Sequence, residues 1–373
     1  MEKKRNGEID VFRFIFSIII VFYHFNLLYP MGFFPYGDLC VEFFFIVSGY
    51  LMAVQVEKLN VECKRPTLGE TADHTWRFII KKMSALFAYY ISVVILHVIV
   101  KEIIINKAAL RDLIVGFLRS IPTFTLTFMG LNYRTVTFYV GNTWFLSAMM
   151  IAMFILYPLI LRNYKYSSKL VCPLMALFLL AYTYSKYGTV VKWEPWDGYF
   201  YLGVIRAVTD IALGISLRPL SVYITEKFAW LLNTERIPIK VLLTLAKLSC
   251  YAVVIKYMNG SDFGQYYSLH GILFFALAIL MTFTGVGYTL PGNKLTNFLA
   301  KISLPIFIYH GFIRLTCKDL FAADRVTLPV FLVMVASSII ISVILMYITD
   351  FTMKLIKKIG GMVKNYALSG KQA

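Results

Sequence analysis

The sequence is poor in charge, since Asp, Glu, Lys and Arg together make up 15% of its 373 residues. A soluble globular chain carries about 25% charged residues, so this one has too few to cover a surface that faces water. The chain also lacks the polar or Gly-periodic composition that intrinsic disorder or collagen requires. These shortages exclude a disordered or collagen-like chain and argue against an ordinary cytosolic enzyme.

Cysteine is scarce as well. A small secreted scaffold needs a dense, even set of cysteines, and a zinc site needs closely spaced ligands. Here the cysteines are far apart and odd in number, and none stands in a C-x-x-C pattern: Cys40, Cys63, Cys172, Cys250 and Cys317. The sequence therefore indicates neither a disulfide framework nor a metal site.

Apolar residues are abundant, because 59% of the chain is hydrophobic and 16% is aromatic. At about 20 apolar residues per span, the long apolar stretches predict an all-α integral membrane protein. Its ten predicted transmembrane helices lie at about residues 9–28, 39–57, 78–100, 143–161, 170–187, 200–217, 241–258, 268–290, 302–320 and 329–353. We interpret the interrupted apolar stretch 111–129 as interfacial or re-entrant. Without repeats or a soluble appendage, residues 1–373 are predicted to form one domain with a core over 8–360.

Basic residues outnumber acidic ones by 37 to 20, which gives a formal net charge of +17. They lie along short loops rather than on one face, so we do not expect nucleic acid as a partner. Basic clusters precede the first predicted span and follow the second, fourth, sixth, eighth and tenth, so both termini are expected in the cytoplasm. The predicted outside loop 101–142 does not follow the positive-inside rule, because it carries five basic residues: Lys101, Lys107, Arg111, Arg119 and Arg134.

Ionisable side chains at membrane depth are costly, so each one is a functional candidate. Arg13 and His24 share the first span, about 16 Å apart along a helix and offset by only about 20° around it. One face is thus expected to carry a cation near the cytoplasm and an imidazole in the outer half. The alternatives are a snorkelling Arg13 paired with Asp10, and a structural hydrogen bond for His24.

The second predicted span runs inward and brings Glu42 to nearly the depth of His24. A carboxylate beside an imidazole fixes its tautomer and raises its basicity, as a general base requires. We therefore expect Glu42 to orient His24. Ser48, deeper in the same span, leaves room for close helix contact or a narrow ligand.

These residues resemble a known family. Arg13 and His24, separated by ten residues, together with V-E-F-F-F-I-V-S-G-Y-L from Val41 to Leu51, are similar to the acyltransferase-3 family of integral membrane acyltransferases. The resemblance continues in N-T-W-F-L-S from Asn142 to Ser147 and in S-L-P-I-F-I-Y-H from Ser303 to His310. It covers nearly the whole chain, and the first 51 residues are its most specific part.

The resemblance implies an enzyme that O-acetylates surface or exported glycans, with acetyl-CoA as donor, in the inner or plasma membrane of a bacterium. It makes His24 the catalytic base and Arg13 essential. Two departures stand out. Glu42 replaces the usual Asp, and the family's arginine-rich stretch reads K-K-M-S-A-L-F-A from Lys81 to Ala88. Lysine offers phosphate a point charge instead of a bidentate fork, which weakens the expected donor contact.

We therefore expect Arg13 with Lys81 and Lys82 to attract the CoA phosphates, with Ser48 beside the donor, and His24 to activate the acceptor hydroxyl. For the remaining candidate residues, a structural role is an alternative to a functional one. His310 and Arg314 share a face of the ninth span and serve either the acceptor site or structural bonding. Substrate contacts are expected from Asn142 and Trp144, unless Trp144 is an interfacial anchor.

The Arg206 and Asp210 side chains, four residues apart on the sixth span, are expected to form an internal ion pair. The expected partners of the protein are membrane lipid, acetyl-CoA and a glycan or lipid-linked sugar, and a homo-oligomer is left open. The main alternative function is a transporter or flippase of a polysaccharide precursor, because intramembrane Arg, His and Glu also form proton relays. Such proteins often show two related halves, and the sequence shows none.

Overall fold

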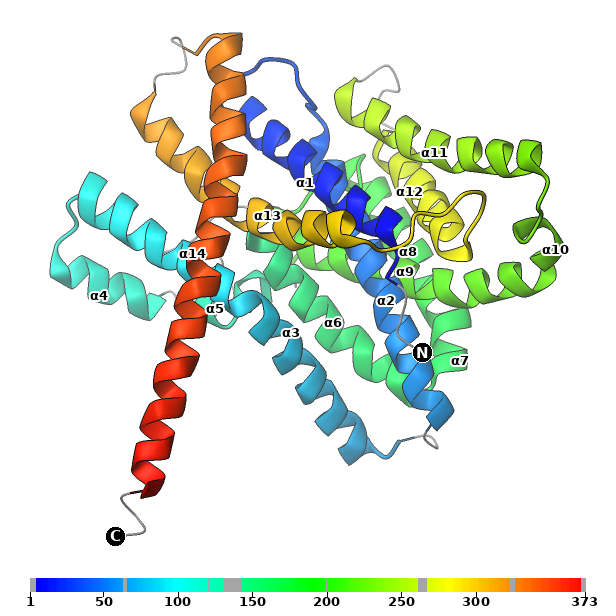
Figure 1. Ribbon diagram of the computed structural model, residues 1–373, viewed down its shortest axis with the longest axis horizontal. Coiled ribbons are helices and arrows are strands. Elements are labelled where there is room, and N and C mark those ends of the chain that lie inside the picture. Colours follow the sequence, from blue (N-terminus) through cyan, green and yellow to red (C-terminus); the bar gives the residue numbers. More distant parts are fainter. Residues whose placement is uncertain are drawn as a thin grey trace.

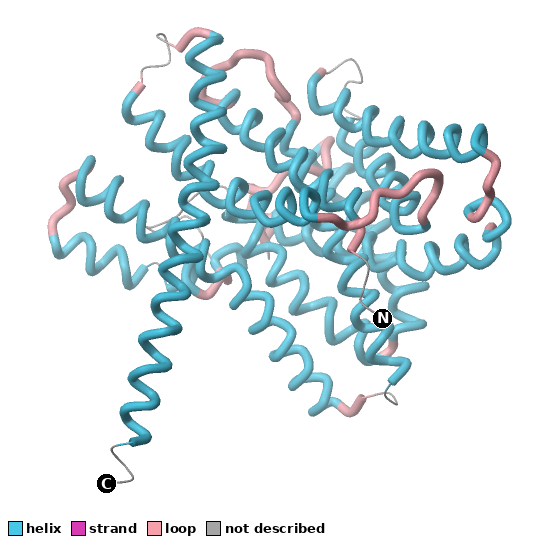
Figure 2. The backbone as a smooth tube through the Cα atoms, viewed as in Figure 1, coloured by secondary structure: helices cyan, strands magenta, loops and turns pink. Residues whose placement is uncertain are grey.

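The computed structural model describes residues 5–62, 66–119, 121–130, 143–198, 200–260, 267–321 and 326–369. Within these ranges the chain forms helices joined by loops and contains no strand, which confirms the predicted all-α fold (Figure 2). The long helices are α1 (Gly7–Asn26), α2 (Cys40–Glu62), α3 (Leu68–His97), α6 (Trp144–Arg162), α8 (Cys172–Tyr187), α9 (Leu202–Lys227), α11 (Ile237–Asn259), α12 (Tyr267–Thr284), α13 (Lys294–Leu320) and α14 (Leu328–Ser369).

Nine helical segments of the described chain are long and apolar enough to cross a membrane. They match nine of the ten predicted spans. The tenth is α1, which does not belong to that set but has 20 residues and therefore a length of roughly 30 Å. The stretch predicted to be interfacial or re-entrant forms only short pieces, α4 (Leu110–Arg119), α5 (Ile121–Phe124) and a 3-10 turn at Phe128–Gly130. None of these pieces reaches across a bilayer.

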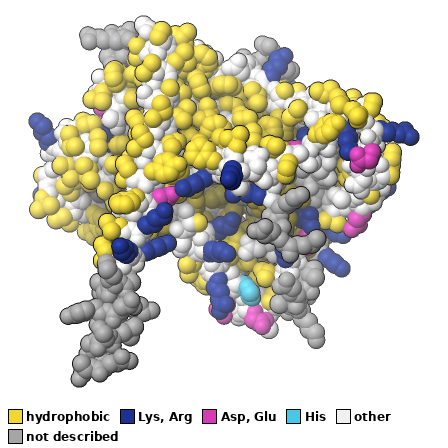
Figure 3. Space-filling view, viewed as in Figure 1, with side chains coloured by type: hydrophobic (Ala, Val, Ile, Leu, Met, Phe, Trp, Pro, Cys, Tyr) yellow, Lys and Arg dark blue, Asp and Glu magenta, His cyan; other side chains and the backbone are white. Residues whose placement is uncertain are grey.

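The surface has the polarity that a membrane requires. On the face shown in Figure 3, hydrophobic side chains cover the upper part, while most Lys and Arg side chains gather in the lower half. Apolar residues of several helices are exposed rather than buried, among them Leu177 and Phe178 on α8 and Val333 on α14. The chain is therefore a multi-pass membrane protein with an apolar belt around a helical bundle.

Close packing of α2 on α9 depends on two glycines. A Cβ added at Gly49 would clash with the backbone carbonyl of Ile211, and one added at Gly214 would clash with that of Ile46. Small residues at a helix crossing let the two backbones approach. The helix pair carries Glu42 and Arg206, so this close approach also sets the distance between those side chains.

We expect Gly214→Ala to destabilise the protein by about 1–3 kcal/mol, because the added methyl group forces α2 and α9 apart. Reversible unfolding in mixed detergent micelles, followed by circular dichroism, measures this effect. Gly69→Ala is the matched control, since a Cβ there meets nothing within 4 Å. Equal stability of the two variants would contradict the packing argument.

The first helix and the late helix α13 run side by side (Figure 1). Their starts are joined by backbone hydrogen bonds from Gly7 N–H to the Leu290 carbonyl at 2.9 Å and from Gly292 N–H to the Arg5 carbonyl at 2.8 Å. Asn6 caps α1 by accepting from the N–H groups of Glu8 and Ile9. This common origin lets the two helices run in the same direction and brings their later halves against each other.

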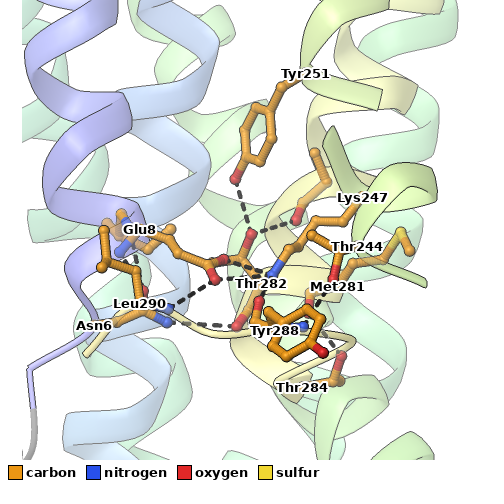
Figure 4. Close-up of polar contacts among 12 residues, drawn as sticks. Asn6, Glu8, Thr244, Lys247, Tyr251, Met281, Thr282, Thr284, Tyr288 and Leu290 are labelled. Atoms are coloured by element: carbon orange, nitrogen blue, oxygen red, sulfur yellow. Dashed lines mark hydrogen bonds and ion pairs between the residues drawn. The ribbon is translucent and has the colours of Figure 1, made fainter. Parts of the chain in front are cut away.

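A buried lysine fixes the start of α1 (Figure 4). Lys247, on α11, lies 2.8 Å from a Glu8 carboxylate oxygen and donates to the Tyr288 carbonyl at 2.9 Å. Glu8 also accepts from Leu290 N–H at 3.0 Å. Sequence reasoning did not single out Lys247, although a lysine within the span predicted at 241–258 was the available signal. The pair ties α1, α11 and the loop before α13 together.

Candidate active site

Two histidines from opposite ends of the chain meet in the bundle. His24 on α1 and His310 on α13 are in contact, with 2.9 Å between His24 Nδ1 and His310 Nε2. Each ring also contacts a carbonyl on its own helix, Ile20 O at 3.1 Å for His24 and Ile306 O at 3.0 Å for His310. The two predicted site residues are thus brought together, and His310 has no exposed surface.

The hydrogen bonds determine which nitrogens carry protons when both rings are neutral. A carbonyl oxygen only accepts, so His310 Nδ1 donates to Ile306 O and leaves its Nε2 as an acceptor. His24 Nδ1 then faces two acceptors, Ile20 O and His310 Nε2, and must carry a proton itself. The remaining nitrogen, His24 Nε2, has a free lone pair. The arrangement therefore presents His24 as a base oriented by His310.

Arg314 completes this cluster from one helical turn beyond His310. Its guanidinium lies within electrostatic range of both imidazoles and of Tyr23. The Nε atom of Arg314 is buried and has no hydrogen-bond partner among the described residues. A partly buried cation beside a free base is the kind of group that stabilises developing negative charge.

Arg13 lies on the same helix as His24 but near its start. It lines a cavity of about 510 Å³ together with Arg5, Asp10, Tyr50 and other residues of α1, α2 and α12. Arg13 forms no direct ion pair with Asp10, because Arg5 binds that carboxylate, with Nε 2.5 Å from Oδ2 and Nη2 3.1 Å from Oδ1, while Asp10 stays within electrostatic range of Arg13. The Arg13 guanidinium is therefore left to face the cavity.

The other residues predicted at the donor site do not line this cavity. Lys82 lies within electrostatic range of Arg13, with its Nζ 5.5 Å from the centre of the Phe78 ring. Lys81 is exposed on α3. Ser48 faces α6 instead, where its hydroxyl donates to Met149 Sδ at 3.8 Å. Only Arg13 of the four contacts the cavity directly.

We expected Glu42 to contact His24, and this prediction is wrong. Its carboxylate accepts from Arg206 Nε at 2.7 and 3.0 Å, and the two side chains are 0% and 1% exposed. The expected internal pair of Arg206 with Asp210 is also wrong, because Asp210 lies beside Glu42 and Arg206 bonds to Glu42. Arg206 pairs across two helices, and neither spacing nor hydropathy along the chain indicates that α2 and α9 are in contact.

Asn142 and Trp144 were both predicted to lie at the outer mouth of the fourth span, and the structure describes only Trp144. Asn142 lies outside the described residues. Trp144 is 5% exposed, so it is a packing residue rather than an interfacial anchor. Its ring stacks on Trp193 at 5.1 Å between centroids and supports the Arg206 guanidinium at 5.4 Å. Trp144 therefore braces the Glu42–Arg206 pair from the side.

The loop between α8 and α9 is tied back to α8 through Asp197. The Asp197 carboxylate accepts from Lys186 Nζ, Tyr182 OH and, at 2.6 Å, Tyr187 OH. These donors, Lys186 first among them, lower the pKa of Asp197 to about 2. The ordinary pKa is about 3.9, so this stabilisation is complete above about pH 4 and is lost as the pH falls through about 2.

We expect the 188–201 loop of the wild-type protein to resist proteolysis equally at pH 5 and pH 8. Asp197→Asn should increase cleavage at both values, because the amide no longer attracts the Lys186 ammonium. Limited proteolysis in nanodiscs with mass spectrometry of the fragments measures this. Asp73→Asn, at an exposed site on α3, is the control. Protection that falls between pH 8 and pH 5 in the wild type would contradict the assignment.

Comparisons with known proteins agree with this architecture. A family model for an acyltransferase domain, that of the acyltransferase-3 family, matches residues 6–347, which is nearly the whole chain. A search of curated proteins and a search of solved structures found no significant match. Taken with the helical bundle and its histidine pair, the match shows that the chain belongs to the acyltransferase-3 family of membrane acyltransferases.

Proposed function

We propose that this membrane acyltransferase moves an acetyl group from acetyl-CoA to a hydroxyl group of a glycan or lipid-linked sugar. The observation that carries the proposal is the 2.9 Å contact between His24 Nδ1 and His310 Nε2, from which we infer a lone pair on His24 Nε2 that can accept a proton. A base of this kind is what the deprotonation of a sugar hydroxyl requires. Family membership favours an enzyme over the transporter considered as the alternative.

In the proposed reaction, His24 Nε2 takes the proton of the acceptor hydroxyl as its oxygen attacks the thioester carbonyl. The carbonyl oxygen becomes an oxyanion, which the Arg314 guanidinium stabilises. The C–S bond then breaks, and the departing CoA thiolate takes the proton from His24. A new ester is formed, and no external acid or base is consumed.

The donor is proposed to enter at Arg13. The phosphates of CoA carry several negative charges, and Arg13 faces the cavity with no ion-pair partner among the described residues. His24 lies 11 residues further along α1, a rise of about 16 Å on a helix. The extended pantetheine arm would bridge that distance and deliver the thioester toward the histidine pair. Lys82 adds positive charge beside Arg13.

We expect Arg13→Gln to raise the KM for acetyl-CoA by about 10- to 100-fold, the equivalent of losing about 1.5–3 kcal/mol of charge-assisted hydrogen bonding. The KM for acetyl-pantetheine, which lacks the nucleotide phosphates, should stay unchanged. Initial rates of thiol release in proteoliposomes measure both constants. Lys165→Gln, at an exposed position after α6, is the control. An equal rise of KM for both donors would rule out a phosphate contact.

The acceptor and the cell location follow from the same proposal. We place the enzyme in the inner membrane of a bacterium, where cytosolic acetyl-CoA and a lipid-linked or exported glycan meet. The test compares base-labile acetyl esters on cell-surface glycans by mass spectrometry in cells with and without this gene. Loss of acetyl esters from one glycan identifies the acceptor, whereas an unchanged set of esters contradicts the proposal.

A further inference from the structure

A second pocket lies where the 3-10 turn Gly37–Leu39 before α2, the start of α12 and loop residues 189–195 meet, away from the Arg13 cavity. Its volume is about 350 Å³, within the range of small-molecule sites. Its lining comprises Asp38, Thr189, Val191, Lys192, Trp193, Glu194, Pro195 and Tyr267. The proposed reaction assigns this pocket no role.

The pocket lies next to the end of α1 that carries the base. Tyr23 directly precedes His24, and the two rings are 5.0 Å apart between centroids. Tyr23 also lies within electrostatic range of Asp38, Tyr267 and Arg314. A Cβ added at Gly37 would clash with the Tyr23 side chain, so α1 and the start of α2 touch there. Tyr23 thus lies near two residues of the pocket lining and directly beside His24.

One polar atom of a residue that lines this pocket is unused. Asp38 Oδ1 is buried and has no hydrogen-bond partner among the described residues. A buried carboxylate oxygen without a donor is costly, which makes it a strong site for an incoming O–H or N–H group. The backbone of Asp38 is held independently, because its carbonyl accepts from Arg206 Nη2 at 2.8 Å.

Carboxylates outnumber cations around the pocket. Arg206 donates to Glu42, to the Val191 carbonyl and to the Asp38 carbonyl, so its guanidinium is satisfied by protein groups. Three carboxyl groups, those of Asp38, Glu42 and Asp210, lie within electrostatic range of this one guanidinium. In the lining itself, Lys192, whose ammonium lies 5.9 Å from the centre of the Tyr187 ring, is outnumbered by Asp38 and Glu194. The pocket therefore offers acceptors to a ligand and repels an anion.

Aromatic rings complete the lining. Trp193 is fixed by stacking on Trp144, and Tyr267 packs against Tyr36 with 4.5 Å between ring centroids. Rigid rings beside hydrogen-bond acceptors suit a ligand with apolar C–H faces and hydroxyl edges. A sugar ring has both.

We infer that this pocket holds the acceptor sugar and selects a ring that carries no acidic group, with the Asp38 carboxylate accepting hydrogen bonds from the sugar hydroxyls. The inference rests on the proposed function in taking a sugar as the acceptor. It adds the position of the sugar ring and the reason why a uronic acid, a sugar that carries a carboxylate, is excluded from the pocket. Asp38 is thus a specificity-determining residue outside the motifs that carry the family resemblance.

The test measures binding without chemistry. Purified protein in nanodiscs, in the His24→Ala background, is probed by saturation-transfer NMR with methyl β-D-glucopyranoside and the corresponding methyl glucuronide. We expect the glucoside to bind more tightly by about 3- to 10-fold, the worth of one hydrogen bond. Asp38→Asn should remove that preference, because the amide no longer repels the uronate. Glu235→Gln, whose carboxylate is 90% exposed, should leave it unchanged.

Equal or tighter binding of the glucuronide, or a preference that survives Asp38→Asn, would overturn the inference. Size-exclusion chromatography checks that each variant is folded. If Asp38→Asn does not fold, Glu194→Gln at the exposed mouth serves instead and should reduce the preference. If acetyl transfer occurs but neither Asp38 nor Glu194 affects the preference for the glucoside over the glucuronide, this inference is overturned and the proposed function is not. If the wild type prefers the glucoside but transfers no acetyl group, the proposed function is overturned and the assignment of the pocket is not.

Discussion

His24→Ala is expected to reduce acetyl transfer by about 10²- to 10⁴-fold, the usual contribution of a positioned general base. The substitution removes the only nitrogen of the histidine pair with a free lone pair, while the helix capped by Asn6 and anchored by Glu8 stays in place. Transfer of radiolabelled acetyl groups in membrane vesicles measures the loss. Protein levels are compared by immunoblot.

His270→Ala is the matched control, because His270 is exposed on α12 and its removal should leave the rate unchanged. His310→Gln should retain more activity than His310→Leu, since the amide oxygen of glutamine still accepts the proton of His24 Nδ1. Near-normal transfer by His24→Ala would remove His24 from the reaction. Equal loss in the two His310 variants would show that His310 does more than orient its partner.

Glu42→Ala is expected to destabilise the protein by about 3–5 kcal/mol, the usual cost of leaving one member of a buried ion pair alone. Its partner Arg206 is 1% exposed, so the guanidinium stays inside the bundle without the carboxylate to which it is bonded. Reversible unfolding in mixed micelles gives the free energy. Activity should fall together with the amount of folded protein, because Glu42 acts through the fold and not at the reacting atoms.

Glu235→Ala provides the comparison for this stability measurement. Glu235 pairs with Lys240 at 2.9 Å, but its side chain is 90% exposed, so its loss should cost about 0–1 kcal/mol. A Glu42→Ala variant as stable as Glu235→Ala would contradict the structural role. A normally folded Glu42→Ala protein without activity would return Glu42 to the catalytic machinery.

Features that depend on composition and periodicity were predictable from the sequence. Apolar run length gave nine spans that the helices confirm, and the break at Pro122 marked a stretch that does not cross the bilayer. His310 and Arg314 were identified as candidates because ionisable residues inside a span are costly. Such a cost shows that a partner must exist without saying which residue it is.

Pairings between helices were not predictable in the same way. The proximity of Glu42 and His24 was inferred from equal depth, but depth does not fix rotation or neighbours around the bundle. The structure turns Glu42 toward α9, where glycines let α2 and α9 approach, and turns His24 toward α13. The Asp38 pocket escaped notice for the same reason, since its lining comes from three separate parts of the chain.

The contact between His24 and His310 has a consequence for biosynthesis. The ribosome makes the first of these residues near the beginning of translation and the second only after most of the chain has entered the bilayer. Until α13 inserts beside α1, the imidazole on α1 lacks the neighbour that orients it. Truncated or stalled chains are therefore expected to be inert toward the thioester, so that reactivity arises only as insertion nears completion.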